Sequence, residues 1–173
     1  QMQDLGETDH GTPISIARQA IESDIVIGLG SIVPHHIPGF SAGAKIVQPG
    51  ISGAATTGAT HFLSTRTRRS YLGSVENVIR HEMETIAERV GLTAVLNTIL
   101  NRDGDVVRAV YGDQRKAFRA GVAVSSDVYG VSFREPADIV IASSYPCDIE
   151  FWQAHKTLYP ADIAVNDGGT IIV

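Results

Sequence analysis

Two apolar runs with nearly the same residues, far apart in the chain, limit what it can fold into. Asp24-Ile-Val-Ile-Gly-Leu29 and Asp138-Ile-Val-Ile-Ala-Ser143 place their apolar residues consecutively, whereas a strand with one wet face alternates apolar and polar residues. Both runs are therefore predicted to be strands of a sheet that is covered on both faces. Each leads into a polar loop, and ligands of open α/β sheets bind beyond the carboxyl ends of the strands. We therefore expect residues 30–45 and 144–156 to lie close together.

The rest of the chain alternates helical and extended patterns. Apolar residues at helical spacing predict helices over 12–22, 73–91, 113–124 and 148–158, the first with Thr12 as N-cap and Pro13 at the first helical position. Short apolar runs predict strands over 92–100, 106–111, 131–133 and 170–173, and an Asp-Gly turn predicts that the first two form a hairpin. The chain is thus predicted to be one α/β domain over residues 1–173, layered, with a mostly parallel sheet, one β-hairpin and helices packed on the faces.

Charge and composition argue against several classes of function. A formal net charge of −5 offers no electrostatic footprint for nucleic acid. No apolar run approaches the ~18–20 residues that cross a bilayer. The single cysteine, Cys147, excludes an internal disulfide framework and fits a reducing compartment. We therefore expect a cytoplasmic protein that binds neither nucleic acid nor membrane.

The segment from Pro34 to Lys45 concentrates the residues most able to do chemistry. Its prolines oppose a regular helix, and its small residues from Gly39 to Ala44 let the backbone approach a ligand closely. His35 is either an acid–base group or metal ligand, or a loop histidine bonded to backbone. His36 is expected to point the other way in an extended chain. Lys45 is a phosphate contact, a buried amine, a covalent attachment point or an ordinary solvated lysine.

A further histidine, His61, follows a run of small residues from Ser52 to Thr60. That run would place His61 on either a helix or a tightly packed loop, as a soft-metal ligand or as a core histidine. The signatures of dinucleotide, P-loop, zinc-protease and serine-hydrolase sites do not occur in the sequence. The residues by themselves predict an α/β domain with a His/Lys loop that binds metal or phosphate.

The combined spacing of these motifs resembles the nickel-dependent lactate racemase family. The resemblance begins with Pro-His-x-x-x-Gly-Phe-Ser-x-Gly-x-Lys over 34–45, the Pro-Gly pair at 49–50, and His61 sixteen positions after Lys45. It continues with Tyr-Pro-Cys-Asp-Ile over 145–149, Trp152-Gln153-x-x-Lys156, and Gly-Gly-Thr-Ile-Ile over 168–172. It thus extends over nearly the whole chain.

This resemblance implies a cofactor and a role for each matching residue. The cofactor is a nickel-pincer nucleotide, which Lys45 would carry through a thioamide bond while His61 supplies a nickel ligand. His35 would be one of two bases that remove the hydroxyl proton of a 2-hydroxy acid, whose Cα hydrogen leaves as hydride. Gln153, Lys156 and Trp152 match positions that contact the cofactor or the substrate carboxylate, although a tyrosine is commoner than Trp152. Ala42 replaces a usual glycine, which is expected to close off positive φ.

The resemblance also implies that the chain is a fragment, covering the middle and C-terminal part of a longer two-domain protein. The missing N-terminal domain would hold the second histidine base and an arginine, and would be a partner together with the proteins that make the cofactor. We therefore expect the piece to lack the cofactor and to be inactive alone. Two alternatives stay open: an epimerase of another 2-hydroxy or sugar acid with the same cofactor, and a non-catalytic α/β domain that binds phosphate or metal.

Overall fold

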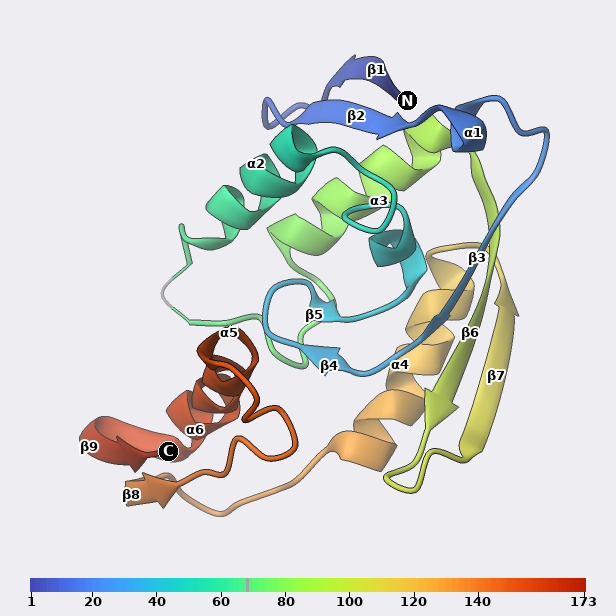
Figure 1. Ribbon diagram of the computed structural model, residues 1–173. Helices are drawn as coiled ribbons and strands as arrows, with labels where there is room; N and C mark the ends of the chain where they lie inside the picture. Colours follow the sequence, from blue (N-terminus) through green and yellow to red (C-terminus); the bar gives the residue numbers. More distant parts are fainter. Residues whose placement is uncertain (68) are drawn as a thin grey trace. The chain divides into compact units, whose positions relative to one another are not determined.

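The computed structural model describes residues 1–67 and 69–173 and divides into two compact units, Gln1–Gly130 and Val131–Val173 (Figure 1). The expected single domain over 1–173 stays a prediction, because compactness alone does not show whether two units fold independently.

The first unit is organised around a three-stranded sheet. Strand β3 (Val26–Ser31) runs parallel to β6 (Leu92–Leu100), and β6 runs antiparallel to β7 (Val106–Gly112). The antiparallel pairing of β6 and β7 confirms the predicted hairpin. The side-chain oxygen of Asn101 closes its turn by accepting hydrogen bonds from the backbone N–H groups of Asp103 and Asp105, both at 2.9 Å. The parallel β3–β6 pair is what makes the architecture α/β rather than a simple meander.

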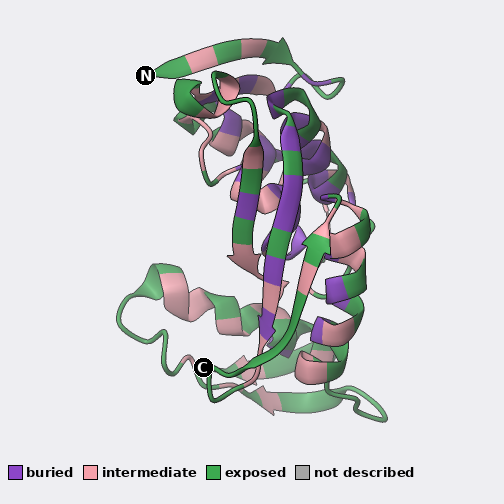
Figure 2. Ribbon diagram, turned by 90° about the vertical axis from the view of Figure 1, so that its right-hand side faces the viewer, coloured by how far each residue is buried: buried purple, intermediate pink, exposed green. Residues whose placement is uncertain are grey.

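Helices cover one face of this sheet (Figures 1 and 2). The 3₁₀ turn η1 (Gly43–Ile46), α3 (Val78–Val90) and α4 (Lys116–Tyr129) contact its strands. Helix α3 begins at Asn77, whose side chain accepts from the N–H of Arg80, and ends at Gly91 with φ +81°, as expected for an Asn N-cap and a glycine terminator. The other face of the sheet is turned to the viewer in Figure 2. Leu29 pairs with Leu96 and Leu96 with Tyr111 across the three strands, and all three side chains are exposed.

The expected helix over 12–22 is wrong for its first half. Residues Pro13–Ala17 form strand β2, which pairs antiparallel with β1 (Met2–Glu7), and only Arg18–Ile21 is helical (α1). Ile14 and Ile16 are fully buried, so the segment follows the two-residue period of a strand. The helical spacing of Ile14, Ala17 and Ile21 was outweighed by pairing with β1, whose polar sequence gave no strand signal.

Helix α2 (Ala54–Ser64) resolves the ambiguity of the small-residue run in favour of a helix. Its buried side chains are Thr56, Thr60 and Leu63, so two of the three are hydroxyls that need hydrogen-bond partners. Thr56 accepts from the N–H of Ser15 at 2.9 Å, and Thr60 accepts from the amide of the buried Gln48 at 2.7 Å. These bonds fix the rotation of α2, and therefore the face on which His61 lies.

The second unit pairs β8 (Ala137–Ile141) with β9 (Val165–Ile172) in parallel. Between them lies a broken helical segment made of α5 (Phe151–Ala154), η2 (His155–Thr157) and α6 (Leu158–Ala164). Its start is three residues later than expected, because the Glu150 carboxylate caps the N–H of Trp152 at 2.8 Å. The expected strand over 131–133 is not formed, and the expected strand over 170–173 is the end of the longer β9.

The α/β class is confirmed, whereas the pairing differs in detail. Among residues 1–67 and 69–173, two strand pairs are parallel and three are antiparallel, so the described strands do not form one mostly parallel sheet. The third antiparallel pair, β4 (Pro34–His35) with β5 (Gly39–Phe40), lies inside the candidate loop. In this described part of the chain, no helix is both long and apolar enough to cross a membrane.

Gly39 is the glycine on which the loop most depends. It has φ +82°, and an added Cβ would lie 1.7 Å from the backbone oxygen of Ser74. Gly39→Ala is therefore expected to lower the free energy of unfolding by roughly 2–4 kcal/mol. The matched control is Gly58→Ala, in α2 with no atom within 4 Å of the added Cβ, which should raise it by about 0.5–1 kcal/mol. Urea unfolding of both variants checks the pair, and equal effects would contradict the assigned geometry.

Candidate functional site

The loop from Pro34 to Lys45 is anchored to the carboxyl end of β3. The N–H of Ser41 donates to the carbonyl of Val33 at 2.9 Å, and the hydroxyl of Ser41 donates to the carbonyl of Ser31 at 2.6 Å. The same hydroxyl accepts from the N–H of Val33 at 2.9 Å. One serine thus ties the returning strand β5 to the end of β3, and the loop leaves the sheet where α/β proteins place ligands.

The rings of His35 and His36 are stacked on one another, so the two side chains do not point to opposite faces. Their centroids are 4.7 Å apart and their planes differ by 11°, so the expectation that His36 points away is wrong. Strand β4 ends at His35, and the next carbonyl, that of His36, accepts the N–H of Tyr71 at 3.0 Å. Because the chain turns at this point, the alternation of an extended strand does not reach His36.

The hydrogen bonding of His35 assigns its tautomer. Its Nδ1 accepts the backbone N–H of Ile37 at 3.2 Å, so the neutral ring carries its proton on Nε2. In this form His35 is a hydrogen-bond donor at Nε2. To accept a substrate proton there, the ring must first release Ile37 and move its own proton to Nδ1. A bond of this length is at the weak end of the range for N–H donors, so the exchange costs on the order of 1 kcal/mol.

Lys45 lies on the 3₁₀ turn η1, which the chain enters through an unusual conformation. Ala42 has φ 59° and ψ −162°, a region almost confined to glycine that costs on the order of 1–3 kcal/mol. The expectation that alanine closes off positive φ here is therefore wrong. The carbonyl of Ala42 accepts the N–H of Lys45 at 3.1 Å, so this strained residue starts the turn that carries the lysine.

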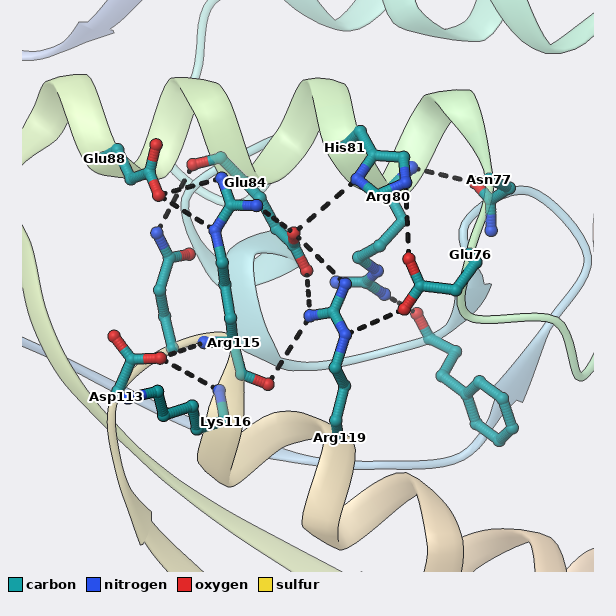
Figure 3. Close-up of polar contacts among 12 residues, drawn as sticks. Glu76, Asn77, Arg80, His81, Glu84, Glu88, Asp113, Arg115, Lys116 and Arg119 are labelled. Carbon is teal, nitrogen blue, oxygen red and sulfur yellow. Dashed lines mark hydrogen bonds and ion pairs between the residues drawn. The ribbon is translucent and has the colours of Figure 1, made fainter.

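Arg80 reaches this strained segment from helix α3 (Figure 3). It lies on α3, is fully buried, and donates through Nη1 to the carbonyl of Ala42 at 3.2 Å and through Nη2 to the carbonyl of Phe40. Its guanidinium carbon is 4.2 Å from the ring centroid of Phe118. The sequence did not predict that Arg80 is buried and bonded to the loop, because Arg80 and Glu84 have the i, i+4 spacing that is usual for an ion pair on a helix surface.

The charge of Arg80 is balanced by a cluster between α3 and α4 (Figure 3). Burial lowers the pKa of Arg80 to about 10, and the attraction of Glu84 opposes this. The buried Glu84 carboxylate also contacts Arg115 at 3.0 Å and Arg119 at 2.8 Å. Arg119 further donates to Glu76 at 2.8 Å and thereby lowers the pKa of that carboxyl. The loop is thus supported by a charge network that spans two helices.

His61 presents a nitrogen suited to a metal. It is half-buried on α2, and its Nδ1–H donates to the carbonyl of Thr57 one turn earlier at 2.8 Å. This bond leaves the lone pair on Nε2, which is the arrangement of metal-binding histidines whose other ring nitrogen donates to a carbonyl. Across residues 1–67 and 69–173, no three His, Cys, Asp or Glu side chains gather as a metal site.

The other predicted contact residues lie in the second unit. Lys156 donates through Nζ to the side-chain oxygen of Gln153 at 2.5 Å, which confirms that the two share one face of the helical segment. Trp152 is 70% exposed. The expected proximity of 144–156 to 30–45 stays a prediction, because these segments belong to different units.

Comparisons with known proteins identify relatives of the chain. Residues 1–73 match the family model of the Lactate racemase N-terminal domain. The chain is 33% identical over 99% of its length to the lactate racemase of Thermoanaerobacterium thermosaccharolyticum, and 30% identical over 98% to that of Lactiplantibacillus plantarum. The lactate racemase apoprotein structure from T. thermosaccharolyticum matches 98% of the chain with a TM-score of 0.92 and 32% identity. The chain is a homologue of the lactate racemases.

The homology covers a part of those racemases. The chain spans 41% of each curated lactate racemase and 42% of the apoprotein chain. Because residues 1–73 match an N-terminal domain, this chain itself contains sequence of that type, whereas we had expected the N-terminal domain to be missing. A Thermotoga maritima protein of known structure, 20% identical with a TM-score of 0.68 over 82% of the chain, shares the fold. The resemblance to lactate racemases is confirmed, and the role of each site residue stays a prediction.

The hydrogen bonds of the two site histidines predict opposite neutral tautomers. His35 should carry its proton on Nε2 and His61 on Nδ1, because their Nδ1 atoms accept and donate respectively. Nitrogen-15 shifts of the imidazole rings above neutral pH check this directly. A histidine in a short unstructured peptide is the reference for a solvated ring, because His81 is itself in contact with Glu76 at 3.4 Å. Finding the same tautomer at His35 and His61 would contradict one of the two assigned hydrogen bonds.

Proposed function

We propose that the chain is part of a racemase that interconverts the enantiomers of a 2-hydroxy acid with a nickel-pincer nucleotide bound through Lys45 and His61. The observation that carries the proposal is the pairing of lactate racemase homology with the geometry of His61, whose Nδ1–H bond to Thr57 leaves Nε2 as a ligand atom. The single cysteine supports a reducing, cytoplasmic location.

The residues present fit such a group. A neutral imidazole is a good nickel ligand, and the lone protein ligand at His61 suits a metal that arrives with other donors already in place. Lys45 follows two residues with positive φ, Ala42 and Gly43, so its backbone is held in a shape that few sequences adopt. An amine on a fixed turn is suited to an amide-like link to a carboxyl-derived group.

The chemistry that the group supplies when bound is reversible hydride acceptance from the substrate Cα. His35 would handle the hydroxyl proton. Its Nε2–H can first donate a hydrogen bond to the substrate oxygen. After the ring releases Ile37 and its own proton moves to Nδ1, Nε2 can take the hydroxyl proton. Inversion needs a second base on the opposite face of the substrate. We propose that the part of the longer protein outside this chain supplies it, since the chain spans 41% of its curated relatives.

The second unit would contribute polar contacts. Lys156 and Gln153 are bonded to one another, so together they offer a cation and an amide to a carboxylate. Trp152 would cover an apolar part of the cofactor or the substrate. We propose as partners a small 2-hydroxy acid, the remainder of the polypeptide and the proteins that make the cofactor.

Deuterium at Cα tests the reaction. The intact parent protein, loaded with cofactor, should invert Cα-deuterated lactate or a related 2-hydroxy acid and retain the deuterium in the product, because hydride returns to the carbon it left. The panel should include sugar acids, since inversion of these alone would indicate an epimerase. Loss of label to solvent would indicate proton abstraction instead, and inversion of no acid in the panel would falsify the proposal.

Capture of the cofactor tests the two binding residues without reference to activity. Lys45→Ala in the intact parent should abolish the covalent adduct, as read by mass spectrometry of the intact chain and its peptides. His61→Ala should keep the adduct and lower the nickel content measured by elemental analysis. The matched control is Lys116→Ala, because Lys116 lies in the first unit at the start of α4. An adduct on Lys116 or Lys156, the two other lysines of the chain, would refute the role of Lys45.

A further inference from the structure

One carbonyl oxygen links Arg80 to the proposed cofactor lysine. The oxygen of Ala42 accepts both Nη1 of Arg80, at 3.2 Å, and the backbone N–H of Lys45, at 3.1 Å. The position of Lys45 at the start of η1 therefore depends on an oxygen that Arg80 holds in place. The sequence motif over 34–45 does not include Arg80, which lies 35 positions after Lys45.

The second arm of the same guanidinium reaches the histidine side of the loop. Nη2 of Arg80 donates to the carbonyl of Phe40, and Phe40 pairs with Pro34 while Gly39 pairs with His35 in the β4–β5 ribbon. One planar group therefore bonds both to the strand opposite His35 and to the turn that carries Lys45. Such a double contact needs the fixed fork of arginine, because the ammonium of lysine is a point charge on a flexible stem.

Phe118 fixes the plane of that fork. Its ring lies under the guanidinium at 4.2 Å and is fully buried, a favourable cation–π arrangement. The same ring leaves no room at Gly43, where an added Cβ would come within 2.7 Å of it. Ring, guanidinium and loop are thus in mutual contact, so a change in one is transmitted to the others.

Stability alone does not account for this cluster. Arg80 is a buried cation whose Nε has no hydrogen-bond partner in the described part of the chain, and burying an incompletely bonded charge is costly. Buried opposite charges, such as those of Arg80 and Glu84, are often no more stabilising than apolar residues of the same size. What Arg80 does provide, through its two carbonyl bonds, is one defined conformation for a strained loop segment, with Ala42 at φ 59°.

We propose that Arg80 is a positioning residue, which sets His35 and Lys45 in one fixed relation by bonding the carbonyls of Phe40 and Ala42. The inference rests on the proposed function for the roles of His35 and Lys45. Arg80 acts through the backbone between them, by its bonds to the carbonyls of Phe40 and Ala42.

The test compares Arg80→Lys with Arg89→Lys in the intact parent protein. Arg89 lies on the same helix and also donates to a backbone carbonyl, that of Glu7 at 2.6 Å, but at the end of strand β1. Arg80→Lys should slow covalent capture of the nickel nucleotide at Lys45 by about tenfold or more, and lower kcat by about tenfold to a hundredfold with little change in KM, since misplacement of about 1 Å has effects of this size. Arg89→Lys should change neither. Wild-type capture and kcat in Arg80→Lys would overturn the proposal.

Hydrogen exchange separates positioning from general loss of stability and from failure of the proposed function. The amide of Lys45 should exchange about tenfold faster in Arg80→Lys, as follows from loss of a bond to its acceptor. Ile86→Val, a core change on the same helix, is the control for stability alone. If Arg80→Lys does not fold, Phe118→Leu removes the ring beneath the cation and should also exchange faster at Lys45 than Ile86→Val; equal exchange would overturn the proposal. Absence of any capture by the wild type would instead refute the proposed function, and the exchange data would still decide the role of Arg80.

Discussion

The buried contact between Arg80 and the carbonyls of Phe40 and Ala42 is the interaction on which the candidate site depends. A cation in a protein interior needs an opposite charge and hydrogen bonds, and the negative charge of Glu84 attracts this one. Glu84 in turn is held by Arg115 and Arg119 from α4. The loop that carries His35 and Lys45 therefore takes its shape from contacts between two helices as well as from its own sequence.

The sheet and helix α2 supply the rest of the frame. Strand β3 ends at Ser31, and Ser41 ties the loop to that end through bonds to Ser31 and Val33. Helix α2 brings His61 by a separate route, and its rotation is fixed by hydroxyl bonds at Thr56 and Thr60. The proposed tether and the proposed metal ligand thus come from elements that are anchored independently, so damage to one need not disturb the other.

The sequence predicted best those features that local chemistry decides. Asn101 and the Asp-Gly pair close the β6–β7 hairpin, and the apolar stripe of α3 ends at Gly91, as the pattern indicated. The sequence-based prediction was wrong where the conformation of a segment depends on a partner far away in the chain. Pro13–Ala17 became a strand because β1 pairs with it, and Ala42 adopts positive φ where Arg80 and Lys45 both bond its carbonyl. Arg80 itself could not be found, since an arginine and a glutamate four positions apart on a helix look the same in the sequence whether the arginine is buried or exposed.

The carbonyl of Ala42 has a consequence for how far the loop can be altered. An amide oxygen has two lone pairs, so it can accept from Nη1 of Arg80 and from the N–H of Lys45 at the same time. The two donors come from a helix and from the loop itself. A shift of the oxygen toward one donor therefore lengthens its bond to the other, so the helix and the turn have to move together.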